Sequence, residues 1–243
     1  MEVMFGRDVS IEMAGARSKV GFACLLGLMA MPAQAQDAPQ YRMEIGGGVG
    51  LVSYEGDFNG NVLKGMRPMG SLVGRYNFDP YKDLRLTVGY GNLKGSSKDV
   101  KTYYPDFQAA EYRFNRSLMD ASLVFEYNFW PYGTGRDYRG AKPLTPYIYG
   151  GLGATVVWGG ETKNVFTANV PLGLGLKYKV SKRMNVGIDW GIHFSLSDDL
   201  DGVKDPYGVS SSGAFKNTDC YSMLQLTLTY SFKEKCRTCN KEE

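Results

Sequence analysis

Apolar and polar residues alternate near the C-terminal end of the chain, at residues 220–232. One set of alternate positions is apolar and ends in two aromatic residues: Leu224, Leu226, Leu228, Tyr230 and Phe232. The positions between them are mostly polar. A period of two predicts a β-strand whose two faces meet different surroundings. Aromatic residues at the end of the apolar face are typical of membrane barrels, whose rims meet the lipid headgroups.

Seven further segments alternate in the same way, so the sequence predicts eight strands. Their ranges are 41–54, 68–78, 83–93, 116–129, 145–158, 167–178, 184–196 and 220–232. Short turns and longer polar loops alternate between them, except that the 15 residues 130–144 stand where a short turn is expected. This asymmetry is the sequence signature of an outer-membrane barrel. We therefore predict an all-β fold, an eight-stranded antiparallel transmembrane β-barrel with both termini in the periplasm.

The composition agrees with a membrane barrel and argues against other classes. Glycine accounts for 31 of the 243 residues and tyrosine for 17. Enrichment in both is typical of a tightly curved barrel with aromatic girdles. The formal net charge of +3 is too small to indicate a nucleic-acid partner. No apolar run approaches the ~20 residues of a membrane-spanning helix.

The N-terminal 35 residues have the layout of a secretory signal peptide. Arg17 and Lys19 precede the apolar run at 20–31, and an A-x-A cleavage motif ends at Ala35. Met13 is an alternative initiator, since the residues before it add nothing that a signal requires. The predicted location is the outer membrane. The chain is thus divided into a signal peptide at 1–35, an outer-membrane barrel at 36–232 and a periplasmic tail at 233–243.

The polar faces of the predicted strands carry charges of both signs in equal number. The cations are Arg42, Arg75, Arg85 and Lys177, and the anions are Glu44, Asp120, Glu126 and Asp189. An eight-stranded barrel is just wide enough for its own side chains to fill, and buried charges must be paired. The sequence therefore predicts a plugged polar interior and not an aqueous pore. Pro171 is on an inner face and lacks an N–H, so we expect a bulge or local break there, near the extracellular rim.

His193 is the only histidine, and Ser195 shares its strand face. A His-x-Ser pair on a barrel strand resembles the lipid A deacylases of outer membranes, in which a serine nucleophile and a histidine base act on lipid. The alternate positions of this strand are apolar, however, so His193 and Ser195 are expected to point into the lumen beside Asp189. We therefore predict no enzymatic activity and no cofactor. The acidic loop at 198–205 lacks the spacing of a calcium-binding loop, so no metal site is predicted.

Three cysteines follow the predicted cleavage site: Cys220, Cys236 and Cys239. A strand of 13 residues, ~40 Å long at ~3.3 Å per residue, separates Cys220 from the other two. Cys220 therefore cannot bond to either of them within one molecule. Cys236-x-x-Cys239 resembles half of a zinc ribbon without its second half. Two alternatives remain for the pair, a local disulfide in the oxidising periplasm or a bond to a partner.

Several segments, in their order and spacing, resemble the PorG family. They are the stretch 169–207, with its strand PLGLGLKY and its loop DLDGV, and the ending LTLTYSFKEKCRTCNKEE. PorG proteins are the outer-membrane barrel component of the type IX secretion system of Bacteroidota. The loop departs from the family's usual sequence, so no role is transferred to it. The resemblance implies no catalysis, and it implies attachment to the periplasmic ring built by the PorK lipoprotein and PorN.

The periplasmic surface is predicted to be the binding surface. The long connection 130–144 carries Arg136, Arg139 and Lys142, and the tail carries the two cysteines. We expect Arg136, Arg139, Cys236 and Cys239 to take part in partner binding. Two alternatives remain: a small structural or ligand-binding barrel outside type IX secretion, and a lipid A-acting enzyme that uses His193 and Ser195.

Overall fold

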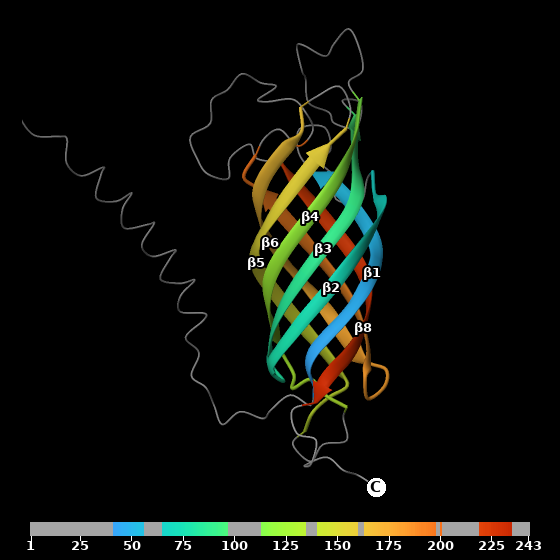
Figure 1. The fold of residues 1–243 in the computed structure, drawn as a ribbon, viewed down its shortest axis with the longest axis vertical. Coiled ribbons are helices and arrows are strands. Elements are labelled where there is room, and N and C mark those ends of the chain that lie inside the picture. The colour runs from blue at the N-terminus through green and yellow to red at the C-terminus, as the bar shows by residue number, and fades with distance from the viewer. Residues whose placement is uncertain are drawn as a thin grey trace, which may run out of the picture. The chain divides into compact units, whose positions relative to one another are not determined.

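A computed structural model describes residues 41–55, 65–96, 113–134, 140–159, 163–197, 200 and 219–234. In these residues eight strands form a closed antiparallel barrel, in which each strand pairs with its sequence neighbours and the last pairs with the first (Figure 1). The strands are β1 (Tyr41–Glu55), β2 (Arg67–Asp79), β3 (Lys82–Ser96), β4 (Arg113–Asn128), β5 (Leu144–Trp158), β6 (Val165–Lys179), β7 (Met184–Ser195) and β8 (Cys220–Glu234). The predicted fold class is confirmed, and the predicted strand ends differ from the observed ones by at most three residues. The predicted signal peptide and most of the predicted tail lie outside the described residues.

The barrel has two different ends. β1 begins and β8 ends at one of them, where Pro80 and Tyr81 join β2 to β3 and residues 180–183 join β6 to β7. We call this the turn end, which is at the bottom of Figure 1. The opposite end, where β1 ends and β8 begins, is the loop end. The connection between β4 and β5 returns to the turn end, as the alternation of the strands requires.

The outside of the barrel is apolar over a height that matches a bilayer. On β4 the outward side chains Met119, Leu123 and, just past the strand, Phe129 are all exposed. Ten residues at ~3.3 Å each, tilted by ~40°, span about 25 Å along the barrel axis, the height of the apolar band of outer-membrane barrels. Further exposed aromatic residues lie at the turn end: Tyr76, Phe78, Tyr81, Trp130, Tyr178, Tyr230 and Phe232. No helix among the described residues is long and apolar enough to cross a membrane.

The inside of the barrel is filled along its whole length, by different side chains in its two halves. The half nearer the loop end holds a buried apolar cluster that includes Val52, Tyr54, Leu93, Phe114, Leu118, Val157, Leu200, Tyr221 and Met223. Buried polar side chains are interleaved with this cluster, among them Arg116 and Asp219. Most of the predicted interior charges lie nearer the turn end. The sequence therefore predicted the polar part of the interior and missed its apolar part, where inward positions of β1, β3, β4 and β8 are apolar.

Two tyrosines of β5 lean over glycines of the neighbouring strands β6 and β7. A side-chain carbon added at Gly173 or Gly191 would collide with the ring or hydroxyl of Tyr149, and one added at Gly175 would collide with Tyr147. Glycine at these positions lets a large aromatic ring lie directly against the backbone. The rings of Tyr147 and Tyr149 are 6.1 Å apart, and the cations Lys177 and Arg85 lie over them.

Pro171 interrupts one ladder without a bulge. The pairing of β5 with β6 runs to Gly150 and Leu172 and resumes at Gly153 and Asn169 in the same register. The pairing of β6 with β7 is continuous through Pro171. The expected local break is present, whereas its predicted position near the rim is wrong, because it lies in the middle of β6.

Candidate functional site

A network of buried ions lies between the middle of the barrel and its turn end, with Glu126 of β4 at its centre. Glu126 is fully buried, and three cations from three strands surround its carboxylate. Its oxygens lie 2.9 Å from Nε of Arg75, 2.9 Å from Nε of Arg85 and 2.7 Å from Nζ of Lys177. The strand period places all of these side chains inward, since each stands at an alternate position of its strand.

Three further carboxylates complete the pairing of these cations. Arg75 binds Glu44 at 2.6 Å, Lys177 binds Asp83 at 2.5 Å and Arg85 binds Asp189 at 3.2 Å. Every member of this network is at most 5 % exposed. The Tyr149 ring also stabilises one of the cations, since the Arg85 guanidinium lies 4.6 Å from the centre of that ring. A buried ion pair survives only with such complete pairing.

A fourth cation, Lys179, balances the four carboxylates at the edge of the network. Its Nζ donates a hydrogen bond to Oδ1 of Asn185 at 3.0 Å. Tyr41 and Tyr132 flank it, with ring centres 5.7 and 5.2 Å from Nζ. Counting Lys179 with the three central cations, four positive charges face four negative ones.

Tyr132 belongs to a strap that folds back against the mouth of the barrel. The described parts of this strap are residues 129–134 and 140–143. The Tyr132 hydroxyl donates to Oδ1 of Asn185 at 3.1 Å, and its backbone N–H donates to the carbonyl of Pro80 at 3.0 Å. Within the strap, Lys142 N–H donates to Pro131, and Gly133 N–H donates to Lys142. Lys179 N–H donates to Pro143. These bonds fix the strap to both β2–β3 and β6.

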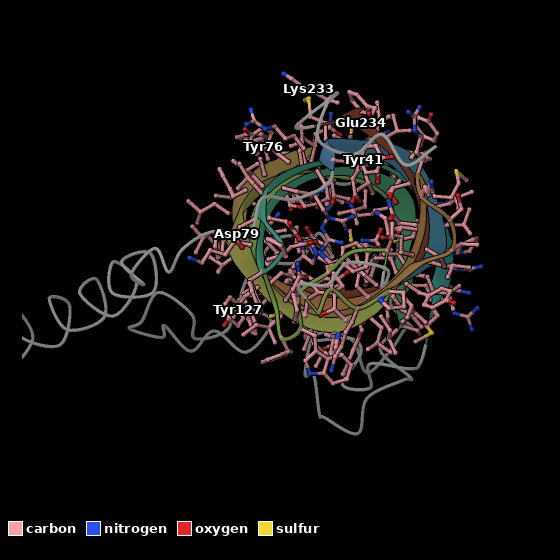
Figure 2. All side chains as sticks on the ribbon, turned by 90° about the horizontal axis from the view of Figure 1, so that it is seen from below. Tyr41, Tyr76, Asp79, Tyr127, Lys233 and Glu234 are labelled. Atoms are coloured by element: carbon pink, nitrogen blue, oxygen red, sulfur yellow. The ribbon has the colours of Figure 1, made fainter. Side chains whose placement is uncertain are left out.

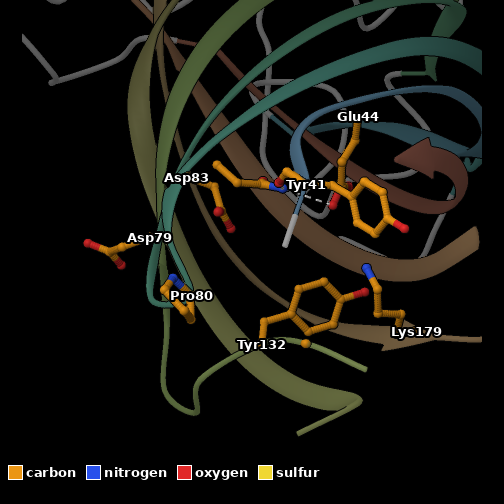
Figure 3. A pocket seen from close by; sticks show the side chains of 9 residues that line it. Tyr41, Glu44, Asp79, Pro80, Asp83, Tyr132 and Lys179 are labelled. Carbon is orange, nitrogen blue, oxygen red and sulfur yellow. Dashed lines mark hydrogen bonds between the residues drawn. The ribbon is translucent and has the colours of Figure 1, made fainter. Parts of the chain in front are cut away.

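A small recess remains at this mouth, between Tyr41, Tyr132 and Lys179 (Figure 3). Glu44, Asn77 and Asp83 lie at its inner side. Its water-accessible volume is about 20 Å³, which is room for about one water molecule. Seen along the axis from the turn end, nitrogen- and oxygen-bearing side chains crowd the lumen while apolar side chains point outward (Figure 2). The arrangement is that of a filled barrel.

His193 and Ser195 point inward, as predicted, and each has its own buried neighbours. His193 is 4 % exposed, its ring stacks on Tyr221 at 4.8 Å, and its Nδ1 lies 3.7 Å from Oδ1 of Asp120. Ser195 is fully buried, and its Oγ accepts a hydrogen bond from the N–H of Ser197. The expected neighbour of His193 was Asp189, which instead binds Arg85. The histidine is packed inside the barrel, away from the lipid.

Asp120 is the centre of a second polar cluster, closer to the loop end. Its Oδ2 accepts hydrogen bonds from Asn169 at 2.8 Å and from the Tyr221 hydroxyl at 2.9 Å. Thr155 joins the cluster through the same hydroxyl at 2.7 Å. Asp120 therefore lies in a polar layer separate from the ions around Glu126, although the sequence placed all eight charges in one network.

The predicted interior charges and partner contacts divide into four groups in the structure. Six of the eight predicted interior charges lie in the network around Glu126, and Asp120 lies in the cluster beside it. Arg42 is half-buried at the turn end, and among the described residues it has no ion pair. The four partner-binding candidates lie outside the described residues: Arg136, Arg139, Cys236 and Cys239.

Sequence reasoning missed four charged or aromatic residues of the interior. Asp83 and Lys179 stand two positions from Arg85 and Lys177, so the strand period could have found them at the strand ends. Arg116 shares the inner face of β4, and it donates to the backbone carbonyls of Leu200 and Lys163. No strand pattern predicts Tyr132, because it lies in the strap, where only the folded chain shows its contacts.

The fold and the interior define a class: a small closed barrel of the outer-membrane type, with an apolar outside and a lumen filled by its own side chains. The chain belongs to the family described as a domain of unknown function, DUF6089, whose model matches residues 20–241. No match was found among curated proteins.

Solved structures of small outer-membrane barrels resemble the chain at low identity. Neisserial surface protein A is 14 % identical, with a TM-score of 0.46, over 78 % of this chain and 97 % of that one. OprG from Pseudomonas aeruginosa is 13 % identical, with a TM-score of 0.47, over 82 % and 99 %. Ail of Yersinia pestis is 10 % identical, with a TM-score of 0.43, over 81 % and 100 %. Likenesses this distant carry no information about function.

Proposed function

We propose that this protein is a non-enzymatic outer-membrane component of a type IX protein secretion machine. In this role its turn end faces the periplasm and attaches to a ring of PorK-like and PorN-like subunits. The proposal rests on the sequence resemblance described above and on the chemistry of the barrel. A lumen filled by ion pairs and apolar side chains is unsuited to conducting a substrate, so the surfaces at its ends are what the barrel offers to other molecules.

The membrane placement follows from the apolar outside. Exposed aliphatic side chains surround the barrel over about 25 Å, with aromatic residues at the rims, which is the pattern of a protein in lipid. In bacterial outer-membrane barrels the short turns face the periplasm and the longer loops face outward. On this basis the turn end, where β1 begins and β8 ends, is proposed to face the periplasm.

The observation that carries the proposal is the strap at the turn end. A connection of this length is long for a periplasmic turn, and hydrogen bonds to Pro80 and from Lys179 hold it against the barrel mouth. Tyr132 anchors it further through Asn185. A surface held by rigid elements loses little conformational freedom when a partner binds. Arg136 and Arg139 adjoin this anchored part in the sequence, and the tail cysteines follow β8, which ends at the same end of the barrel, so these four residues are the proposed contacts.

The experiment is a crosslinked pull-down of the tagged full-length barrel from intact envelopes, followed by identification of the partners. We expect the ring subunits to be recovered with the wild type, less with Arg136→Gln/Arg139→Gln, and less after deletion of 235–243. Lys163→Gln, at the loop end, is the matched control and should recover them normally. If no ring subunit is recovered from wild-type envelopes, the barrel works outside type IX secretion and the proposal is wrong.

The tail cysteines are tested separately on non-reducing gels. Residues three apart close a very small loop, so an internal disulfide would stabilise the chain little. A bond to the PorK-like lipoprotein would anchor the barrel instead. We expect a reductant-sensitive band with a partner that disappears in Cys236→Ser and Cys239→Ser. If that band is absent and the pull-down is unchanged in both variants, attachment relies on the strap alone.

A further inference from the structure

Two exposed lysines lie on neighbouring segments of the turn end, which is at the bottom of Figure 1. Lys142 is in the strap, directly before Pro143 and the start of β5, and Lys182 is in the turn between β6 and β7. The Pro143 carbonyl accepts a hydrogen bond from the N–H of Lys179, the last residue of β6, which joins the two segments. We call Lys142 and Lys182 the rim lysines.

The apolar belt of the barrel extends as far as the rim lysines. Leu144 of β5 pairs with Tyr178 of β6, and both side chains are exposed. Toward the middle of the barrel the same two strands expose Leu176, Ile148 and Leu174. Aromatic residues at the end of such a belt mark the level where lipid chains meet their headgroups. The rim lysines come after Leu144 and Tyr178 toward the turn end, so their ammonium groups reach the headgroup layer.

An aromatic ring holds one rim lysine at this level. The Lys142 ammonium lies 4.7 Å from the centre of the Trp130 ring, which is 40 % exposed. The attraction to the ring leaves the positive charge in place, and an ammonium group has three N–H donors. The backbone is fixed as well, because Lys142 N–H donates to Pro131 and its carbonyl accepts from Gly133. A group positioned in this way loses little conformational freedom when it binds an anion.

The strands beside the rim lysines supply no carboxylate for them. β5 and β6 contain no acidic residue, and the one acid of β7, Asp189, is buried and binds Arg85. Glu234 of β8 binds Arg183 at 2.8 Å. Neither rim lysine has an ion pair within the part of the chain that the structure describes. Their positive charge is therefore offered to an anion outside the protein.

We propose that Lys142 and Lys182 bind the phosphate of an anionic phospholipid in the leaflet that meets the turn end. A lipid fits both features of this surface, because its phosphate lies at the headgroup level and its acyl chains lie against Leu144 and Tyr178. The two ammonium groups donate charge-assisted hydrogen bonds to the phosphate oxygens. The inference rests on the membrane placement and not on attachment to a periplasmic ring.

The test is native mass spectrometry of the full-length barrel in mild detergent. The protein is titrated with phosphatidylglycerol, with the diacylglycerol that lacks its phosphate, or with inorganic phosphate. We expect binding of phosphatidylglycerol and little binding of diacylglycerol. Lys142→Gln and Lys182→Gln should each weaken lipid binding about fivefold, the effect of one cation near an anionic surface, and the double variant should weaken it further. Lys142→Arg/Lys182→Arg keeps both charges and should bind as the wild type does.

The matched control is Lys82→Gln at the same end of the barrel. This lysine has a carboxylate of its own, since its ammonium lies 3.9 Å from Asp79, so the variant should bind lipid as the wild type does. A loss as large as that of Lys142→Gln would overturn the proposal, because net charge and not the rim lysines would then set the affinity. All variants are first checked for a folded barrel by their mobility on gels before and after boiling.

Three other outcomes would also overturn the proposal. The first is equal binding of phosphatidylglycerol by the wild type and the folded Lys142→Gln/Lys182→Gln variant. The second is equally tight binding of diacylglycerol, because the acyl chains alone would then explain it. The third is displacement of the lipid by inorganic phosphate at matched concentration, because the site would then recognise a small anion. Lost lipid binding with an intact ring pull-down, or the reverse, separates this inference from the proposed function.

Discussion

Removing the charge of Glu126 tests whether the buried ion network holds the barrel together. Three cations lie within 2.9 Å of its carboxylate, and they belong to β2, β3 and β6. Glu126→Gln keeps the shape of the side chain and removes its charge. The remaining carboxylates Glu44, Asp83 and Asp189 then face the same cations with one negative charge fewer. Breaking a buried ion pair costs about 3–5 kcal/mol, because a charge is left without its partner in a medium that solvates it poorly.

The loss of stability expected for Glu126→Gln can be compared with that for an exposed ion pair in the same protein. Arg183 and Glu234 also bond at 2.8 Å, but their side chains are 50 % and 38 % exposed. Water screens an exposed pair and each side chain loses conformational freedom in forming it, so Glu234→Gln should cost far less than Glu126→Gln. Both variants are refolded into lipid vesicles, and unfolding by denaturant is followed by tryptophan fluorescence.

A third variant separates loss of charge from loss of packing. Glu126→Gln/Lys177→Met removes one charge of each sign, so the network is balanced again and the double variant should recover part of the lost stability. A loss below 1 kcal/mol for Glu126→Gln, or a double variant less stable than the sum of both single changes, would refute the reasoning. In that case water would solvate the network and the lumen would not be filled.

Three further predictions concern the lipid face, the interior packing and the histidine. Leu226→Arg, in the middle of β8 and 51 % exposed, should lower the free energy of unfolding by about 2–4 kcal/mol. Leu196→Arg, just past the loop-end tip of β7, should lower it by at most about 1 kcal/mol. Equal losses for the two variants would mean that the bilayer does not lie at the middle of β8. Gly191→Ala should cost about 1–3 kcal/mol because the methyl group meets a buried tyrosine, while Gly74→Ala, with open space outside, should be nearly neutral; vesicle unfolding measures both. His193→Gln should leave the acylation pattern of lipid A unchanged in mass spectra, and a change in acyl number would favour the enzyme alternative.

The strands were predictable because side chains alternate between the outer and the inner face of a strand. Lipid outside and a narrow polar lumen inside impose a period of two, and the observed strand ends lie close to the predicted ones. The partners of individual charges were not predictable, because pairing across the lumen depends on the shear of the closed barrel. His193 illustrates this point: Asp189 is nearer in sequence, yet Asp120 on β4 lies opposite the histidine ring. Alternation also gives no signal where both faces are apolar, as at Leu118 and Val157.

The strap marks another limit of sequence reasoning. A segment rich in glycine, proline and basic residues is also compatible with a solvated turn, and its length and its basic residues made it a candidate for binding. Only the fold shows that Tyr132 reaches Asn185 and lies beside Lys179. The Tyr132 ring completes the flanks of a buried cation, so part of the strap belongs to the interior of the barrel.

The residues that stabilise the barrel are different from the residues proposed to bind a partner. The lumen charges are paired with one another, and the outer belt is matched to lipid chains, so substitutions in either should change folding first. The proposed partner contacts Arg136 and Arg139 belong to neither group. Their substitution should leave denaturant unfolding unchanged while it weakens partner binding. An Arg136→Gln/Arg139→Gln variant that lost stability, or a Glu126→Gln variant that kept its stability and lost a partner, would contradict this separation.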